Sequence, residues 1–282
     1  MALNTQLTDA AQLLSTGINE GMGAARTNLG GSGTAFGWAG GLVPTVADYA
    51  TTATASGMSF KATLVTESGT PATVVAAGAG KPAAAALSSS SIDLKKFAGL
   101  GSFTLEDRLE AVGLGSAIAS VLGASTLKAF ESYSTAVLDA GAGSTVTGGD
   151  WVAAVANAQA EVLSNGGKPS VLVLSAADYG DFVADVLATN AFAQSPDSPV
   201  GAVLGTPVHV SPGLGTGKAF VFDSSAVLCV QHEASPLVVV DAVSQADMNV
   251  ARLVIDLVAA TWIADANLVV EITAPTLKAA KK

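Results

Sequence analysis

The feature that most constrains this fold is a stretch of small residues between two strand-like segments. Residues 66–91, TESGTPATVVAAGAGKPAAAALSSSS, have little capacity to bury a core of their own. The flanking segments, MSFKATLV (58–65) and IDLKKFAGLGSFT (92–104), have the β-branched and aromatic content that is typical of strands. The pattern predicts a long protruding hairpin with a small-residue tip. Because two strands alone are marginally stable, we expect the hairpin to lie on another subunit.

Charge is scarce in this chain. Charged residues make up 13% of the sequence, against about 25% in an average soluble protein, and the mean hydropathy is +0.50. Residues 27–47 are uncharged but rich in Gly, Ser and Thr, and residues 111–127 are too short to span a bilayer. No basic residue precedes Arg26, so the charged start of a signal peptide is missing. We therefore expect a soluble, non-secreted chain that is largely covered by neighbours in a large assembly.

The order of predicted elements indicates a mixed, α+β fold class. Thr104 and Asp107 have the spacing of a capping box, and glycines predict a break in the following helix near residues 113–115. Ser175 is expected to cap a later helix, with Asp178 in its first turn. Along the chain we expect a helix at 5–20, a flexible glycine-rich arm at 21–41, the hairpin, a helix from Leu105, a loop at 141–149, a helix at 151–163, a buried strand at 169–175, a helix through Leu187, and strands from Pro207 onward.

The segment SPGLGTGKAFVFD (211–223) resembles a phosphate-binding loop, because three glycines stand just before Lys218. A Walker-type loop needs a further glycine and a Ser or Thr, where this sequence has Pro212 and Ala219. It also needs a helix directly after the loop, whereas the residues that follow are strand-like. The preceding residues are strand-like too, so we expect the glycines to turn a hairpin. A nucleotide-binding enzyme that uses residues 213–218 remains the distant alternative.

The remaining candidate chemical groups predict no conventional active site, cofactor or metal centre. Cys229, the single cysteine, lies in an apolar strand and is expected to be buried. His209 and His232 have no Cys, Asp or Glu cluster at metal-ligand spacing, although Glu233 follows His232. The net charge of −10 disfavours a protein that grips DNA, but it suits a wall that encloses DNA without holding it.

In this order, the elements resemble the major capsid protein of tailed double-stranded DNA bacteriophages, which has the Hong Kong 97-type fold. The resemblance begins near residue 40 and covers nearly the whole chain from there. No motif is specific alone, and their fixed order carries the resemblance. The stretches that carry it are GGLVP (40–44), GAGKPAAAALSSSSIDLKKFAG (78–99), PSVLVLSAADYGDFVADV (169–186) and VLGTPVHVSPGLGTGKAFVFD (203–223).

The resemblance implies four regions and a shell-forming function. They are an N-arm (1–42), an extended loop (56–98), a peripheral domain with a long spine helix (43–55, 99–148 and 242–282) and an axial domain (149–241). The chain would self-assemble as pentamers and hexamers into the icosahedral shell of a virion, formed in the host bacterial cytoplasm, around DNA that it encloses without sequence-specific binding. An encapsulin-type nanocompartment, which packages enzymes in a shell of the same fold, is the nearer alternative.

Two partners are also implied by the resemblance, a portal and a scaffolding protein. The family often carries a long N-terminal scaffolding segment that is removed on maturation, whereas only about 40 residues precede the body here. Either a separate scaffolding protein or a chain that is already trimmed would explain this difference. The initial Met1 favours a separate scaffolding protein.

Some members of the family join their subunits by an isopeptide bond between a lysine and an asparagine, assisted by a glutamate. The resemblance places the lysine at Lys81 and the asparagine at Asn249, and Asp256 stands where the family has glutamate. A neutral amine would attack the amide carbon and expel ammonia, and a carboxylate in a dry site would take its proton. Aspartate is one methylene shorter than glutamate, so the reaction is expected to be sensitive to its placement.

Overall fold

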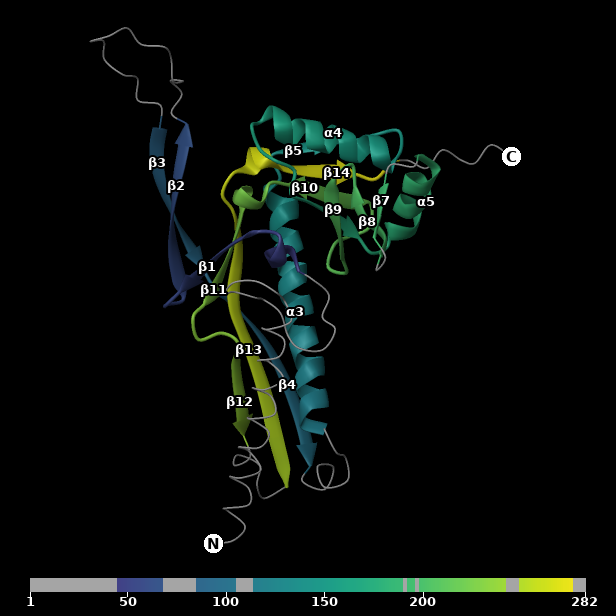
Figure 1. The fold of residues 1–282 in the computed structure, drawn as a ribbon. Helices are drawn as coiled ribbons and strands as arrows, with labels where there is room; N and C mark the ends of the chain where they lie inside the picture. Colours follow the sequence, from purple (N-terminus) through teal and green to yellow (C-terminus); the bar gives the residue numbers. More distant parts are fainter. Residues whose placement is uncertain are drawn as a thin grey trace, which may run out of the picture.

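The computed structural model describes residues 45–67, 85–104, 114–189, 192–195, 198–241 and 249–275. These residues form two main sheets, a separate hairpin and the helices that pack on them. A long helix, α3 (Leu114–Gly141), and a long strand, β13 (Val250–Ile263), run side by side along the molecule (Figure 1). Within the described residues, no helix is both long enough and apolar enough to cross a membrane.

The first sheet has five strands and is built around β13. On one side β13 pairs with β11 (Val227–His232) and β12 (Leu237–Asp241), and on the other side it pairs with β4 (Lys95–Thr104). β1 (Thr51–Ala55) adds to β11 in parallel. Alternate residues of β13, among them Leu253 and Ile255, share a buried cluster with Phe130 of α3. The helix therefore covers one face of this sheet.

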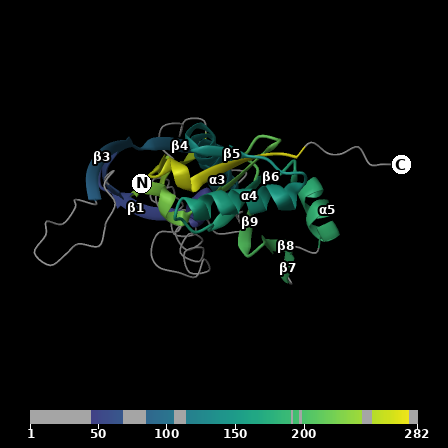
Figure 2. The same ribbon diagram turned by 90° about the horizontal axis from the view of Figure 1, so that it is seen from above.

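The second sheet has seven strands in the order β5-β14-β10-β6-β9-β8-β7. Its central strand β6 (Val171–Ser175) has every residue buried. The helices α4 (Trp151–Ser164) and α5 (Tyr179–Thr189) pack on one face, and the end of α3 around Leu138 packs on the other. Figure 2 shows α4 and α5 together along this sheet. The other strands are β5 (Ser144–Val146), β7 (Phe192–Ser195), β8 (Ser198–Val203), β9 (Thr206–Ser211), β10 (Lys218–Phe222) and β14 (Val269–Thr273).

The predicted protruding hairpin is present as the two strands β2 (Ser59–Glu67) and β3 (Ala85–Asp93), which pair only with each other (Figure 1). Its base is attached to the first sheet, because Ile92 and Ala62 share a buried cluster with Ala260 of β13. Residues 68–84, the larger part of the expected small-residue tip, lie outside the described residues.

Several predicted elements are confirmed and others are displaced. The helix at 151–163 is α4, whose N-cap Asp150 accepts a hydrogen bond from the Ala153 amide at 2.7 Å. The return strand of the hairpin was wrongly assigned: β3 lies mostly within the expected small-residue tip, whereas most of the expected return strand at 92–104 is β4, which pairs with β13. Glycines let β4 lie close to α3, since a Cβ atom at Gly101 would meet the Ile118 side chain at 2.8 Å. The later helix begins at Tyr179, since Ser175 ends β6 and its hydroxyl accepts only from Ala177 in an intervening turn. The loop at 141–149 contains the short strand β5.

The two sheets cut across the four regions expected from the sequence. β11 and β12 lie within 149–241 in the sequence, yet both pair with β13 of the first sheet. β14 lies within 242–282, yet it pairs with β10 and β5 of the second sheet.

The predicted helix at 5–20 and the arm at 21–41 lie outside the described residues, as do residues 105–113. Short 3-10 helices complete the described elements at Val46–Asp48 (η1), Ser224–Ala226 (η2) and Ala266–Leu268 (η4).

Candidate functional site

The glycine loop does not turn a hairpin, so this part of the sequence interpretation was wrong. β9, before the loop, and β10, after it, are separated by β6, which pairs with both of them. Strand β6 takes the central place between them, because its residues VLVL are apolar and can be buried on both faces. The residues after the loop form β10, so no helix N-terminus follows the glycines to bind a phosphate group.

The glycines instead bring the loop close to α3 and α5. A Cβ atom at Gly213 would lie 2.8 Å from the Ser132 Cα atom, and the Thr135 hydroxyl donates to the Gly213 carbonyl at 3.2 Å. Gly217 has a φ of +85°, which favours glycine, and its amide donates to Asp178 Oδ2 at 2.6 Å. Gly215 has neither feature. The loop therefore packs against α3 and the start of α5 and has a structural role.

Lys218 is the residue that a phosphate-binding loop would use, and here it forms ion pairs within the chain. Its Nζ atom contacts Asp139 of α3 and lies 3.4 Å from Glu271 of β14. The hydrogen bond to Asp139 is the main cause that raises the pKa of Lys218, and Glu271 adds to the effect. The lysine links the end of α3 to the second sheet.

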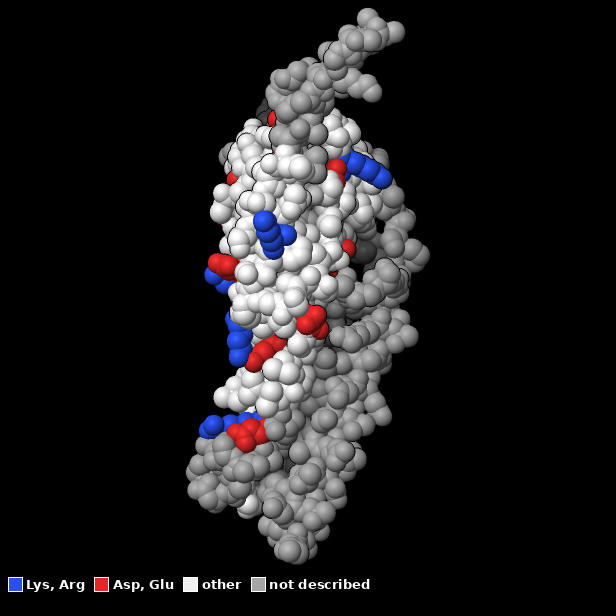
Figure 3. Space-filling model, turned by 90° about the vertical axis from the view of Figure 1, so that its left-hand side faces the viewer, with Lys and Arg blue, Asp and Glu red and all other residues white. Residues whose placement is uncertain are grey.

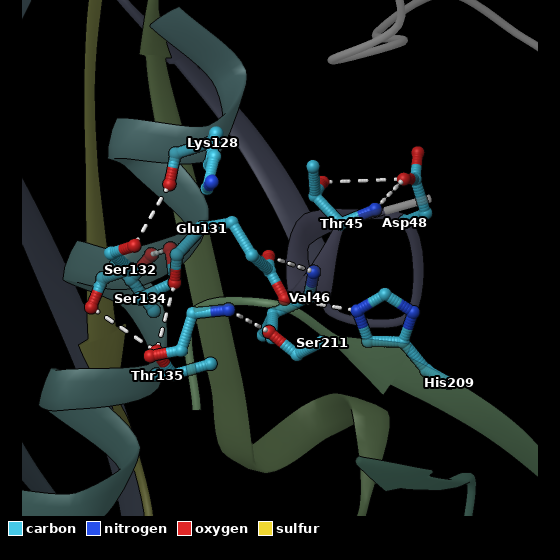
Figure 4. Close-up of polar contacts among 12 residues, drawn as sticks. Thr45, Val46, Asp48, Lys128, Glu131, Ser132, Ser134, Thr135, His209 and Ser211 are labelled. Carbon is cyan, nitrogen blue, oxygen red and sulfur yellow. Dashed lines mark hydrogen bonds and ion pairs between the residues drawn. The ribbon is translucent and has the colours of Figure 1, made fainter. Parts of the chain in front are cut away.

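A buried polar junction lies where α3, the second sheet and the beginning of the described chain meet (Figure 4). Glu131 of α3 is only 2% exposed. Its Oε2 atom accepts the Val46 amide at 2.8 Å, and its Oε1 atom lies 2.9 Å from Nε2 of His209, which is also 2% exposed. One carboxylate therefore joins three parts of the chain that are far apart in the sequence.

The turn around Val46 is ordered by its own contacts. The Asp48 Oδ2 atom accepts the Thr45 amide at 2.6 Å and the Thr45 hydroxyl at 3.2 Å. The Tyr49 ring lies 5.4 Å from the His209 ring, between centroids. Burial raises the pKa of Tyr49, and the carboxylates of Asp48 and Glu131 add to the shift. The sequence interpretation did not find Glu131, although an acidic residue beside Phe130 on an apolar helix face is an unusual feature that could have identified it.

The other candidate groups are consistent with structural roles. Cys229 is buried, as predicted, and burial raises its pKa to about 12. His232 accepts the Ala234 amide at 3.1 Å through Nδ1. Among the described residues, no group of three His, Cys, Asp or Glu side chains could hold a metal ion.

Of the three predicted cross-linking residues, the structure describes Asn249 and Asp256, and these two lie apart within one chain. Lys81 lies outside the described residues. Asn249 is exposed immediately before β13, and Asp256 lies seven positions further along, which in an extended strand is about 20 Å. Asp256 is 7% exposed and its Oδ2 atom contacts Lys96 Nζ at 2.6 Å, whereas its Oδ1 atom is buried without a hydrogen-bond partner.

The face of the first sheet opposite α3 is partly uncovered. Val239 of β12, Val254 of β13 and Leu100 of β4 form one row across three strands, in which Leu100 is 60% exposed and Val239 is 42% exposed. Leu237 in the next row is 50% exposed. We call these four residues the open sheet face. On the described part of the face in Figure 3, most of the surface is uncharged, and the Lys, Arg, Asp and Glu side chains are scattered over it.

Comparisons with solved structures identify the fold. The structure of Mycobacterium phage Adephagia aligns with a TM-score of 0.65 at 16% identity, over 91% of this chain and 98% of that chain. The capsid of Cyanophage P-SCSP1u aligns with a TM-score of 0.61 at 15% identity, over 87% and 91% of the two chains. A virus-like particle from Pyrococcus furiosus aligns with a TM-score of 0.59 at 12% identity, over 94% and 98%. Neither the family models nor the curated protein sequences give a match.

These similarities extend over nearly the full length of each protein. The chain therefore has the α+β fold of phage capsid and virus-like-particle subunits, the Hong Kong 97-type fold that the sequence resembles. Because the sequence identities are only 12–16%, the similarity establishes the fold alone and not the function.

Proposed function

We propose that this chain is a major capsid protein, which assembles as pentamers and hexamers into an icosahedral shell around a bacteriophage double-stranded DNA genome. It would be located in the virion capsid after assembly in the host cytoplasm, with a separate scaffolding protein and a portal as partners. The observation that carries the proposal is the similarity, over most of the chain, to the capsid of Cyanophage P-SCSP1u and to the structure of Mycobacterium phage Adephagia. No enzymatic activity is required for this function.

The exposed apolar residues support an assembled state. They lie on every major part of the chain: Leu87 on the hairpin is 76% exposed, Val121 on α3 is 69% exposed, and Leu163 on α4 is 59% exposed. Together with the open sheet face, they leave apolar side chains in water on several sides of the subunit. Contacts with several neighbours, as in a closed shell, would cover such scattered surfaces.

The outer face of α3 supports an enclosing function. Its exposed positions from Val121 to Ala140 are mostly alanine and serine, and Lys128 and Asp139 are the charged residues among them. A surface with these residues has few cations to neutralise phosphate groups, so it would not hold DNA firmly. If this face lines the interior of the shell, DNA would pack against it without sequence-specific binding.

A nanocompartment that packages enzymes is the second candidate. It is favoured by the similarity to the virus-like particle from Pyrococcus furiosus, which covers nearly all of both chains. The contents of purified particles distinguish the two functions, because a capsid encloses DNA and a nanocompartment encloses cargo protein.

Negative-stain microscopy of the purified protein tests the proposal directly. We expect closed particles, and nuclease-protected DNA in particles from the natural source. A deletion of residues 66–90 should give a folded body that assembles poorly, because the partners of the hairpin are expected on other subunits. Full-length protein that sediments as a single monomeric species at micromolar concentration would contradict the shell function.

Isopeptide cross-linking by Lys81, Asn249 and Asp256 remains a proposal of its own. Because Asn249 and Asp256 are far apart within one chain, the reacting groups would have to come from different subunits. Asp256 would also have to exchange its contact with Lys96 for the incoming amine. Mature particles boiled in denaturant should give a ladder above 27.7 kDa that is lost in Lys81→Arg. A single band at the monomer mass would rule the bond out.

A further inference from the structure

We propose that Glu131 couples the position of residues 45–49 to strand β9 of the second sheet. The coupling is intramolecular and does not depend on the shell function. Its basis is that the two oxygens of one carboxylate serve two different segments, the Val46 amide at 2.8 Å and the His209 imidazole at 2.9 Å (Figure 4).

The burial of the junction makes the two contacts interdependent. Glu131 and His209 are each 2% exposed, and Val46 is fully buried. If either segment moved away alone, it would leave a buried carboxylate oxygen without a donor, which is costly in the protein interior. The remaining contact would then hold the carboxylate in a place where water cannot replace the lost partner. The favoured states are therefore both contacts made, or both lost together.

The turn at residues 45–49 also lies between the two hydrophobic cores. Val46 belongs to the cluster that contains Phe220 of the second sheet, whereas Ala47 belongs to the cluster that contains Phe130 and the first sheet. The contacts of Asp48 with Thr45 keep the turn in one shape. A displacement of this turn must therefore change its packing against both sheets, and Glu131 transmits the displacement to His209.

Coupling of this kind is reciprocal: a change at residues 45–49 must alter β9, and a change at β9 must alter residues 45–49. A purely local role for each hydrogen bond predicts instead that each change affects its own segment. The two possibilities differ in hydrogen exchange at the segment that was not changed.

Val46→Pro removes the amide that Glu131 accepts. Proline is well tolerated at the first position of a helix, and Thr45 already has the extended backbone that precedes proline, with φ −110° and ψ 167°. Val46→Ala is the matched control, because it shortens the side chain and keeps the amide. We expect the amides of residues 206 and 208–211 to exchange at least about fivefold faster in Val46→Pro than in Val46→Ala, the lower end of typical coupling between sites.

The reciprocal variant is His209→Leu, which removes the imidazole and should accelerate exchange at residues 47–55. His209→Gln restores a side-chain N–H near Glu131 and should recover much of the protection. Ser134→Ala is a second control, because it removes a buried hydrogen bond of 2.7 Å between α3 and Thr261 and touches neither segment. If Val46→Pro fails to fold, the comparison of His209→Leu with His209→Gln gives the same test. Acceleration confined to the segment that carries each substitution would overturn the coupling.

Discussion

The β2–β3 hairpin and the seven-stranded sheet both consist of regularly paired strands, but they differ in residue content and in surroundings, since β3 is AALSSSSID and β6 is VLVLS. In the sheet, all five residues of β6 are buried between helices. In the hairpin, Leu87 and the serines at 88–91 are exposed, although they pair with β2 in regular register. The difference teaches that small polar residues can form a regularly paired strand, whereas burial needs apolar side chains together with the elements that the fold places on either side.

The sheet can therefore be stable within one chain, while the outer hairpin needs a second molecule. An isolated two-stranded hairpin is marginally stable in water. Here its base is held by Ile92 and Leu94, which are each 5% exposed. We expect another subunit to cover the part of the hairpin that extends beyond this base. Substitutions in the two regions should consequently differ in what they change, folding in the sheet and assembly in the hairpin.

Thiol labelling gives the largest expected contrast between the regions. Cys229 is fully buried, and its pKa is raised to about 12, so the native thiol is both inaccessible and protonated. In unassembled protein at pH 8, Leu87→Cys should react at least about a thousandfold faster than Cys229, because Cys229 must wait for unfolding. Assembly should slow the reaction at position 87. Equal labelling rates at the two positions would show that Cys229 is accessible to solvent in the folded subunit.

Truncation of a core side chain should have the next largest effect. Phe220 of β10 is fully buried in the second sheet. Phe220→Ala should lower the free energy of unfolding by about 3–5 kcal/mol, as measured by chemical denaturation. The matched hairpin variant, Leu87→Ala, should leave this free energy nearly unchanged and weaken assembly instead. A large loss of subunit stability in Leu87→Ala would contradict the division between the regions.

Within the glycine loop, the effect of a substitution should depend on backbone conformation. Gly217 has a φ of +85° with open space around it, so Gly217→Ala should cost about 1–2 kcal/mol through backbone strain. Gly215→Ala has the same open space without the positive φ and should be nearly neutral. Denaturation midpoints of the two variants measure the difference. Equal midpoints would show that the loop relaxes freely.

Lys218→Met should have the smallest effect, because the lysine is partly exposed and its ion pairs are accessible to solvent. Its pKa is raised in the folded state, so the protonated form is the one that the fold stabilises. The contribution of the Lys218 ion pairs to the free energy of unfolding is fully present below the unfolded pKa of about 10.4. It is lost as the pH rises through the higher pKa of the folded state. The stability difference from wild type should therefore be constant near neutral pH and decline only in strong alkali. A nucleotide-dependent rise in melting temperature that Lys218→Met abolishes would restore the phosphate-loop interpretation.

The sequence predicted local elements well where periodicity and end signals agreed. The helix after Asp150 and the buried strand before Ser175 follow from apolar spacing and from nearby turn residues. The start of α5 was misplaced, because Ser175 is a good capping residue but ends a strand whose register is fixed by β9 and β10. Of the candidate cross-linking residues, the sequence identified Asp256 as a strand residue, but its contact with Lys96 depends on the pairing of β4 with β13.

The sequence by itself determined the α+β class, the presence of a protruding hairpin and the shortage of charge, because these depend on residue types and short-range spacing. Only the tertiary structure decided which strands are neighbours, so that β6 separates β9 from β10 and β11 joins the first sheet. It also decided that Glu131 meets His209, 78 residues away. The physical reason is that an apolar strand or a buried carboxylate needs a partner, but its own residues do not specify which one. That choice depends on how all the buried surfaces of the chain fit together at once.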